Sequence, residues 1–159
     1  MKADKETRVI YLASPYGFSS QMSKSLLPEF IEVIEGLGAR VWEPFNKNSK
    51  INLDTYGCAY QIGRNNINGL NGSDAIFAIV NGTPPDEGVM IEIGIAIASK
   101  KPIFLFRDDF RKCSDSNQYP LNLMIFSGLP KQNWEEYYYK SINEISDKEK
   151  ALYKYLNNN

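Results

Sequence analysis

The stretch that decides the fold is Gly82-Thr83-Pro84-Pro85-Asp86-Glu87-Gly88-Val89-Met90-Ile91-Glu92-Ile93-Gly94-Ile95-Ala96-Ile97-Ala98. It follows the continuously apolar run 75–80, which is typical of a strand covered on both faces in a parallel sheet. After a turn that holds two acids, the chain becomes apolar almost all the way round, which predicts a buried helix. The stretch therefore indicates a strand–turn–helix unit of an α/β protein.

One carboxylate, Glu92, interrupts the apolar helix in its second turn. A buried carboxylate is costly unless it is paired, protonated or functional, and no Lys or Arg lies within four residues. Glu92 is therefore the first candidate for chemistry, and the alternative is a structural carboxylate bonded to a buried tyrosine or a backbone amide. Asp86, just before the helix, has an ordinary structural interpretation as its N-cap. Glu87, in the first turn, has one as a partner of the helix dipole.

The rest of the chain alternates between strand and helix signals. This alternation predicts a single α/β domain over residues 1–159, a flavodoxin-like or Rossmann-like sandwich with about five parallel strands and helices on both faces. Ligands in such sheets bind beyond the carboxyl ends of the strands, so the loops there are expected to surround one crevice. These loops are Ser14–Gly17, Pro44–Asn48, Asn81–Gly88 and Asp108–Asn122. The expected strands are 8–13, 39–42, 75–80, 102–106 and 136–139; the expected helices are 22–37, 55–70, the segment after residue 86, and 141–156; and 46–54 and 107–130 are expected to be connections.

Composition excludes several classes of function. The 159 residues contain no histidine, which removes imidazole catalysis and histidine-ligated metals, and two cysteines are too few for a cysteine-only metal site. A net charge of −1 provides no general attraction for nucleic acid, and no apolar run approaches the roughly 20 residues of a membrane span. Phosphate-loop and dinucleotide fingerprints are absent, so no cofactor is expected. The charged N-terminus lacks a signal-peptide core, which favours a cytoplasmic protein.

Taken together, the motifs resemble the nucleoside 2-deoxyribosyltransferase family. The strand Ile10-Tyr11-Leu12-Ala13-Ser14-Pro15 is similar to the family's opening, and residues 86–96 match its D-x-G-x-x-x-E-x-G-x-A signature. Lys101-Pro102, Arg107-Asp108-Asp109 and Asn122-Leu123-Met124 follow in the same order and spacing. The resemblance covers nearly the whole chain and implies transfer of 2-deoxyribose between nucleobases, without metal or cofactor.

The resemblance also implies roles for individual residues. Glu92 stands where the family has its catalytic nucleophile, Asp86 where it has an acid that contacts the nucleoside, and Tyr11 where a tyrosine orients the nucleophile. Asn122 matches an asparagine that reaches the sugar 5′-hydroxyl from a neighbouring subunit, and Met124 lines the same shared pocket. The match implies a homo-oligomer built from dimers, as large as the hexamers common in the family. The other expected substrate-binding residues are Ser14, Tyr16, Asn48, Asn66 and Gly88.

One position departs from part of the family. Some members have Asp where this chain has Asn66, and an amide cannot deliver a proton at neutral pH. Asp86 is then the stronger candidate for the acid that protonates the leaving base. A carboxylate nucleophile at Glu92 would hold the sugar covalently between two displacements, as in retaining glycosidases.

Two other functions remain open at this point. The first is hydrolysis of the N-glycosidic bond of nucleosides or nucleoside 5′-monophosphates, and the second is a non-catalytic nucleotide-sensing domain. Relatives that accept monophosphates have a loop with Gly and Arg after the first strand. Here residues 14–20 contain two aromatic side chains and no basic residue. This composition suits stacking on a base better than binding a phosphate, so free nucleosides are favoured over monophosphates as substrates. The sequence leaves open whether purines alone or both base classes are accepted.

Overall fold

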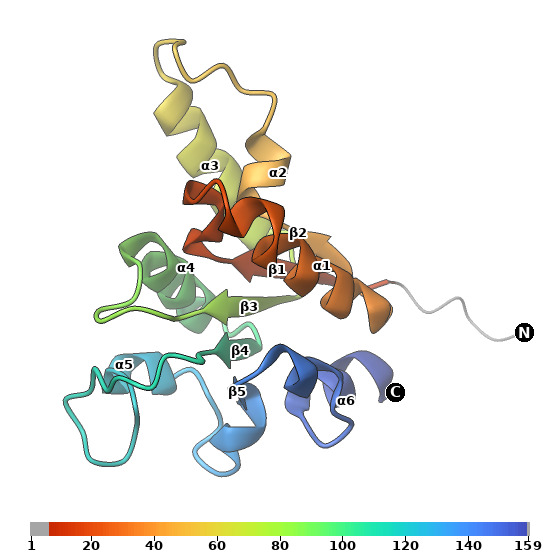
Figure 1. The fold of residues 1–159 in the computed structure, drawn as a ribbon, viewed down its shortest axis with the longest axis vertical. Helices are drawn as coiled ribbons and strands as arrows, with labels where there is room; N and C mark the ends of the chain where they lie inside the picture. The colour runs from red at the N-terminus through yellow and green to blue at the C-terminus, as the bar shows by residue number, and fades with distance from the viewer. Residues whose placement is uncertain (1–6, 159) are drawn as a thin grey trace, which may run out of the picture.

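The computed structural model describes residues 7–158, which fold around a five-stranded, all-parallel sheet (Figure 1). The strand order is β2-β1-β3-β4-β5, and all four pairings are parallel. This is the flavodoxin-like order, so the predicted sheet is confirmed. The strands are β1 (Val9–Ala13), β2 (Arg40–Trp42), β3 (Ala75–Ile79), β4 (Ile103–Phe106) and β5 (Tyr138–Tyr139).

Side chains alternate across the central strands, so the sheet has an apolar core on each face. On β1, Ile10 and Leu12 pack with α1 and α6, whereas Tyr11 and Ala13 pack with α3 and α4 on the opposite face. Helices therefore cover both faces of the sheet, as the sequence predicts. The helices are α1 (Leu26–Gly36), α2 (Pro44–Asn48), α3 (Cys58–Asn71), α4 (Glu87–Ala98), α5 (Leu123–Phe126) and α6 (Ala151–Asn157). The 3₁₀ helices are η1 (Pro15–Phe18), η2 (Met22–Lys24), η3 (Trp134–Tyr137) and η4 (Ile142–Ser146).

The predicted loop 46–54 is partly wrong, because α2 extends to Asn48. The carboxylate of Glu43 accepts hydrogen bonds from the backbone N–H groups of Phe45 (2.9 Å) and Asn46 (2.8 Å), and Pro44 occupies the first turn. An N-cap acceptor followed by proline is a helix start. In Figure 1, α2, α3 and the loop between them project at one end of the molecule, and the loop after β4 projects at the other.

The predicted final helix 141–156 is divided in the structure. The spacing of Ser141 and Glu144 predicts a capping box that opens one continuous helix. In the structure Ser141 makes no capping bond through its side chain, and the carboxylate of Glu144 accepts from the backbone N–H of Lys140 instead. A 3₁₀ helix ends at Ser146, and α6 begins only after a turn. The hydroxyl of Tyr139 accepts a 2.8 Å hydrogen bond from the N–H of Leu152, so β5 helps to fix the start of α6.

The prediction that α4 is buried all round is wrong for the single chain. Val89, Ile93 and Ala96 pack in the core, but Ile91 is 64% exposed, and Ala98, about two turns further along the same side, is also exposed. One side of α4 therefore presents an apolar surface to solvent. Among residues 7–158, no helix is long and apolar enough to cross a membrane.

Candidate active site

A cavity of about 710 Å³ lies beyond the carboxyl ends of the strands, where the loop after β1 meets α2, α3 and the start of α4. The strand order reverses between β1 and β3, and such a switch point is the usual ligand site of a doubly wound sheet. Three of the four loops expected at the crevice contribute to it. Its lining comprises Ser14, Phe18, Pro44, Phe45, Asn48, Ser49, Ile51, Leu53, Ile62, Asn66, Asp86, Glu87, Gly88, Val89, Ile91 and Glu92.

Glu92 lines this cavity and is held from the sheet side by Tyr11. The Tyr11 hydroxyl donates a 2.5 Å hydrogen bond to Oε1 of Glu92, and the tyrosine itself is fully buried. Its ring stacks on Trp42 with 5.0 Å between ring centroids and 11° between planes. This packing fixes the donor, so Tyr11 orients the carboxylate of Glu92.

Burial raises the pKa of Glu92 to about 7, while the hydrogen bond from Tyr11 acts to lower it. The negative charges of Asp86 and Glu43 also contribute to this raised pKa. Burial, together with the charge of Glu92, moves the pKa of Tyr11 far above its ordinary value, so the tyrosine remains a proton donor. The site thus holds a carboxylate that changes charge near neutral pH, as catalytic carboxylates often do.

Asp86 is the N-cap of α4 and also lines the cavity. Its Oδ1 accepts a 3.0 Å hydrogen bond from the N–H of Val89, which confirms the N-cap interpretation. Within residues 7–158, no hydrogen bond is recorded for Oδ2. A Cβ at Gly88 would lie 3.1 Å from Asp86 Oδ1, closer than ordinary contact, so glycine leaves room for the carboxylate. Asp86 therefore has one structural oxygen and one that can serve a ligand.

Asn48 and Asn66 are joined in one amide network. Asn48 donates 2.8 Å hydrogen bonds to the carbonyl oxygen of Pro44 and to Oδ1 of Asn66, and its Oδ1 accepts from Asn65 at 3.0 Å. Both amide protons of Asn48 are thus engaged within the protein, whereas no hydrogen bond in residues 7–158 involves Nδ2 of Asn66. The free donor of the pair belongs to Asn66.

An aromatic wall that the sequence analysis did not single out closes one side of the cavity. Phe18 and Phe45 pack edge to face at 4.8 Å between centroids. A Cβ at Gly17 would lie 2.0 Å from the Phe45 ring, so only glycine permits this packing. The run of aromatic residues after β1 was the signal for Phe18, but Phe45 enters through the fold of α2.

Glu43 is the second residue that the sequence did not reveal. It is 2% exposed, both of its oxygens cap α2, and its charge acts on Glu92 and Tyr11. It therefore positions the helix that carries Asn48 and adds negative charge behind the site.

Three of the predicted substrate-binding residues lie outside this cavity. Tyr16 is 7% exposed, packs on Phe30 and receives a hydrogen bond from Asn81, so the core uses it. Asn122 and Met124 line a separate cavity of about 800 Å³ that also contains residues of α4 such as Gly94. Much of the loop 108–122 lines or flanks this second cavity, so the expectation of a single crevice was wrong for that loop.

The donor set of the main cavity favours acid–base or nucleophilic chemistry by carboxylates. Glu92 and Asp86 are available, and the lining contains no Lys, Arg or cysteine. Within residues 7–158, no group of three His, Cys, Asp or Glu side chains is placed to hold a metal ion.

Comparison with known proteins identifies the family of this chain. A family model described as nucleoside 2-deoxyribosyltransferase matches residues 10–124, which include Tyr11, Asp86 and Glu92. A nucleoside deoxyribosyltransferase of Limosilactobacillus fermentum is 30% identical over 132 residues, covering 76% of this chain and 75% of that protein.

Solved structures share the fold. A 2-deoxyribosyltransferase from Bacillus psychrosaccharolyticus has a TM-score of 0.66 at 24% identity, with 87% of this chain and 90% of that chain covered. A second, from Leishmania mexicana, has a TM-score of 0.63 at 23% identity, covering 86% and 92%. A CMP N-glycosidase from Clostridium botulinum has a TM-score of 0.52 at 20% identity, covering 89% and 96%. By its match to the family model over residues 10–124 and its 30% identity to the Limosilactobacillus fermentum protein, this chain belongs to the nucleoside 2-deoxyribosyltransferase family.

Proposed function

We propose that this protein transfers the 2-deoxyribosyl group between nucleobases, with overall retention, through a covalent deoxyribosyl intermediate on Glu92. The observation that carries the proposal is the 2.5 Å hydrogen bond from buried Tyr11 to a Glu92 carboxylate that lines a nucleoside-sized cavity. A cavity of about 710 Å³ lies within the usual range for small-molecule sites, roughly 300–1,000 Å³.

In the first step, ionised Glu92 attacks C1′ of the nucleoside and the C1′–N bond breaks. The bonding electron pair leaves with the base, whose ring nitrogen is protonated by the acid form of Asp86. The negative charge of Glu92 stabilises the oxocarbenium-like transition state, and its attachment to a helix fixes the geometry of attack. In the second step a new base attacks C1′, returns its proton to Asp86, and releases Glu92. Tyr11 donates to the carboxylate whenever Glu92 is free.

We assign the base to the aromatic wall and to Asn66. Phe18 and Phe45 offer apolar ring surface for stacking, and the unengaged amide N–H groups of Asn66 suit an acceptor on the base edge. Because both amide protons of Asn48 are already used within the protein, Asn48 holds Asn66 in place and donates no hydrogen bond to the base. Ser14 and Gly88 line the same cavity and are proposed to contact the nucleoside.

The preferred substrates are free 2′-deoxynucleosides. A 5′-phosphate is bound most strongly by guanidinium or ammonium groups, and this cavity is lined by three carboxylates without a Lys or Arg. A phosphate would therefore be repelled rather than bound.

We further propose that the active unit is a homo-oligomer with shared sites. Asn122 and Met124 line the cavity on the far side of α4 from Glu92's pocket, and Met124 is 65% exposed. The apolar side of α4 lies between the two cavities. A second copy packed on that side would cover Ile91 and bring its own Asn122 toward the site of the first. A monomeric sedimentation profile in an active preparation would contradict this arrangement.

The second candidate function is hydrolysis, in which water replaces the acceptor base. The same Glu92 and Asp86 would serve it, and the fold is shared with a CMP N-glycosidase. A third candidate is a non-catalytic nucleotide-sensing domain. This function would not require a buried carboxylate held by a hydrogen bond from Tyr11, so it is the least favoured of the three.

The deciding experiment is incubation with 2′-deoxyinosine plus adenine and, in parallel, plus cytosine, followed by chromatography. Deoxyadenosine is the expected product, and deoxycytidine as well would mean that both base classes are accepted. Free deoxyribose and hypoxanthine alone would indicate a hydrolase, and no turnover would favour the sensing domain.

The intermediate is tested separately by acid quenching the enzyme during turnover and measuring peptide masses. The expected adduct lies on the peptide that contains Glu92, and Glu92→Ala removes both adduct and exchange. Glu32→Ala, which changes an exposed carboxylate on α1, is the matched control and retains both.

A further inference from the structure

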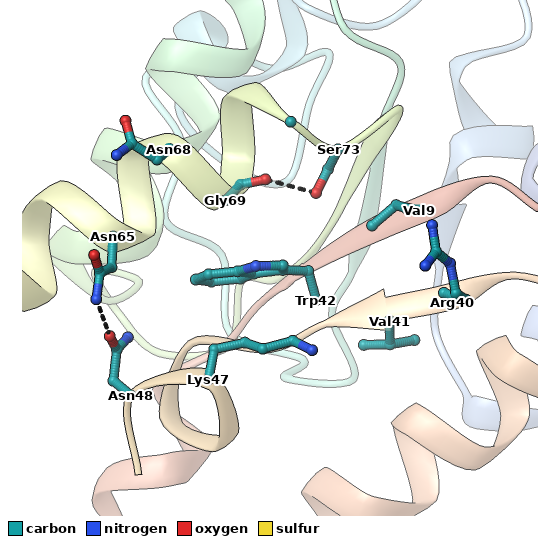
Figure 2. Close-up of a pocket in the computed structure, with 11 residues that line it drawn as sticks. Val9, Arg40, Val41, Trp42, Lys47, Asn48, Asn65, Asn68, Gly69 and Ser73 are labelled. Carbon is teal, nitrogen blue, oxygen red and sulfur yellow. Dashed lines mark hydrogen bonds between the residues drawn. The ribbon is translucent and has the colours of Figure 1, made fainter. Parts of the chain in front are cut away.

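A third cavity, of about 600 Å³, lies at the edge of the sheet between β2, α2 and α3 (Figure 2). In Figure 2 the indole of Trp42 lies between α3, which carries Asn65 and Asn68, and the side chain of Lys47. Of the residues that line this cavity, the proposed catalytic chemistry uses only Asn48, which also lines the catalytic cavity. The lining comprises Val9, Arg40, Val41, Trp42, Lys47, Asn48, Asn65, Asn68, Gly69, Gly72 and Ser73.

The cavity carries positive charge without a compensating acid. Arg40 and Lys47 both line it, no carboxylate does, and neither cation forms an ion pair within residues 7–158. The carboxylates near the lining in sequence are engaged with backbone groups. Glu43 caps α2, Glu35 accepts from the N–H of Val41 at 3.3 Å, and Asp74 accepts from that of Val9 at 2.7 Å. Two unpaired cations on one concave surface favour an anion.

Amide groups on α3 provide a second kind of contact. Asn65 uses its NH₂ group for Asn48, and no hydrogen bond within the described chain involves its Oδ1 or the side chain of Asn68. These groups offer both donors and acceptors beside the flat surface of Trp42. A volume of about 600 Å³ exceeds what an inorganic anion needs and suits an organic molecule.

We propose that this cavity binds a small organic phosphate, with Arg40 and Lys47 on the phosphate and Asn65 and Asn68 on the polar organic part. Guanidinium and ammonium groups form the strongest hydrogen bonds available to phosphate oxygens. The charge distribution is the opposite of that in the catalytic cavity, which has carboxylates and no cation. The two cavities therefore select phosphorylated and unphosphorylated ligands respectively.

The structure also connects the two cavities. Asn48 lines both of them, and it is bonded to Asn65 on one side and Asn66 on the other. Trp42 stacks on Tyr11, the residue that donates to Glu92. A ligand that engages the side chain of Asn65 is expected to shift it and so to disturb its hydrogen bond to Asn48, which would alter base exchange. This second part rests on the proposed function, whereas binding itself does not.

Binding is tested by calorimetric titration of the full chain with inorganic phosphate, 2-deoxyribose 5-phosphate and AMP, with 2-deoxyribose as the uncharged control. Saturable binding of the organic phosphates is expected, tighter than that of inorganic phosphate, with none for the free sugar. The double variant Arg40→Gln/Lys47→Gln weakens binding at least about tenfold. Lys24→Gln/Lys148→Gln, at exposed positions elsewhere, leaves it unchanged.

Absence of saturable binding by all three phosphates would overturn the site. Undiminished binding in the Arg40→Gln/Lys47→Gln variant would overturn its location, and equal affinity for inorganic phosphate and AMP would overturn the role of Asn65 and Asn68. These outcomes do not depend on catalysis, so they are separate from failure of the proposed transfer reaction.

The connection is tested by measuring base exchange with and without the tightest-binding phosphate. A change in KM or kcat of at least about twofold is expected in the wild-type chain and none in Arg40→Gln/Lys47→Gln, whose basal exchange is unchanged. Binding with no effect on exchange would overturn the connection through Asn48.

Discussion

The hydroxyl of Tyr11 donates to Oε1 of Glu92 at 2.5 Å, and this bond joins the first strand to α4 across 81 residues of sequence. It opposes burial, which raises the pKa of Glu92 to about 7. The ionised fraction of the proposed nucleophile near neutral pH is therefore set by two competing effects. Each effect can be changed by a single substitution.

Replacing Tyr11 with Phe removes the hydrogen bond that favours ionised Glu92. The pKa of Glu92 is then expected to rise, because a donor to a carboxylate stabilises its charged form. The acid limb of the profile of kcat/KM against pH moves to higher pH, and part of the activity lost at about pH 7 returns at about pH 9. Tyr60→Phe changes an exposed ring and leaves the profile in place. An unshifted limb in Tyr11→Phe would mean that the bond does not govern ionisation.

Glu43→Gln is expected to move the same limb in the opposite direction. Glu43 contributes a negative charge that raises the pKa of Glu92, and the glutamine removes that charge while keeping one acceptor for the α2 N–H groups. The weaker cap costs about 0.5–2 kcal/mol of stability. Chemical denaturation measures this cost separately, and a limb that moves upward would contradict the electrostatic account.

The raised pKa of Glu92 also makes a prediction for stability. Between its ordinary value of 4.5 and about 7, the folded chain binds this proton more tightly than the unfolded chain does. Folding stability from this group therefore falls as pH rises through that window, and the full penalty applies above it. Glu92→Gln removes the penalty, so the variant should exceed wild type by roughly 1–3 kcal/mol at about pH 8.5 and by much less near pH 4.5. Urea unfolding at both pH values checks this, and Glu32→Gln serves as the exposed control.

The sequence predicts the sheet well because its central strands are contiguous apolar runs. The segment 75–80 and the segment 102–106 differ from β3 and β4 by one residue each. The division of the final helix was not predictable, since the start of α6 is fixed by a hydrogen bond from Leu152 to Tyr139 and not by the local pattern at Ser141.

The sequence was sufficient to predict those site residues that lie close together in one segment. Asp86, Gly88 and Glu92 follow one strand, so their grouping could be read from sequence spacing. Phe45 and Glu43 could not be found this way, because their roles depend on α2, and the sequence pattern did not predict that helix. The prediction of full burial for α4 was wrong because an apolar pattern gives the hydrophobicity of each side of a helix but does not identify the residues that would cover it.

Two glycines provide a matched pair of substitutions. Gly17→Ala places a methyl group 2.0 Å from the Phe45 ring, so the aromatic wall must move. The KM for nucleosides should rise roughly 2- to 10-fold, the loss of one aromatic contact. Gly63→Ala, in the open middle of α3, should leave KM unchanged and stabilise the chain by about 0.5–1 kcal/mol. An equal KM for nucleosides in the two variants would show that Phe18 and Phe45 do not bind the substrate.

Mixing two inactive variants tests whether active sites are shared between copies. Glu92→Ala removes the nucleophile and Asn122→Ala removes the group proposed to come from the neighbour, since Asn122 lies outside its own copy's catalytic cavity. A hybrid dimer has one site with both lesions and one intact site, so random mixing restores about a quarter of wild-type sites. The measurement is base exchange after the two variants are unfolded and refolded together, compared with each refolded alone. Mixed samples that recover no activity, when wild type survives the same treatment, would assign Asn122 to a role within its own chain.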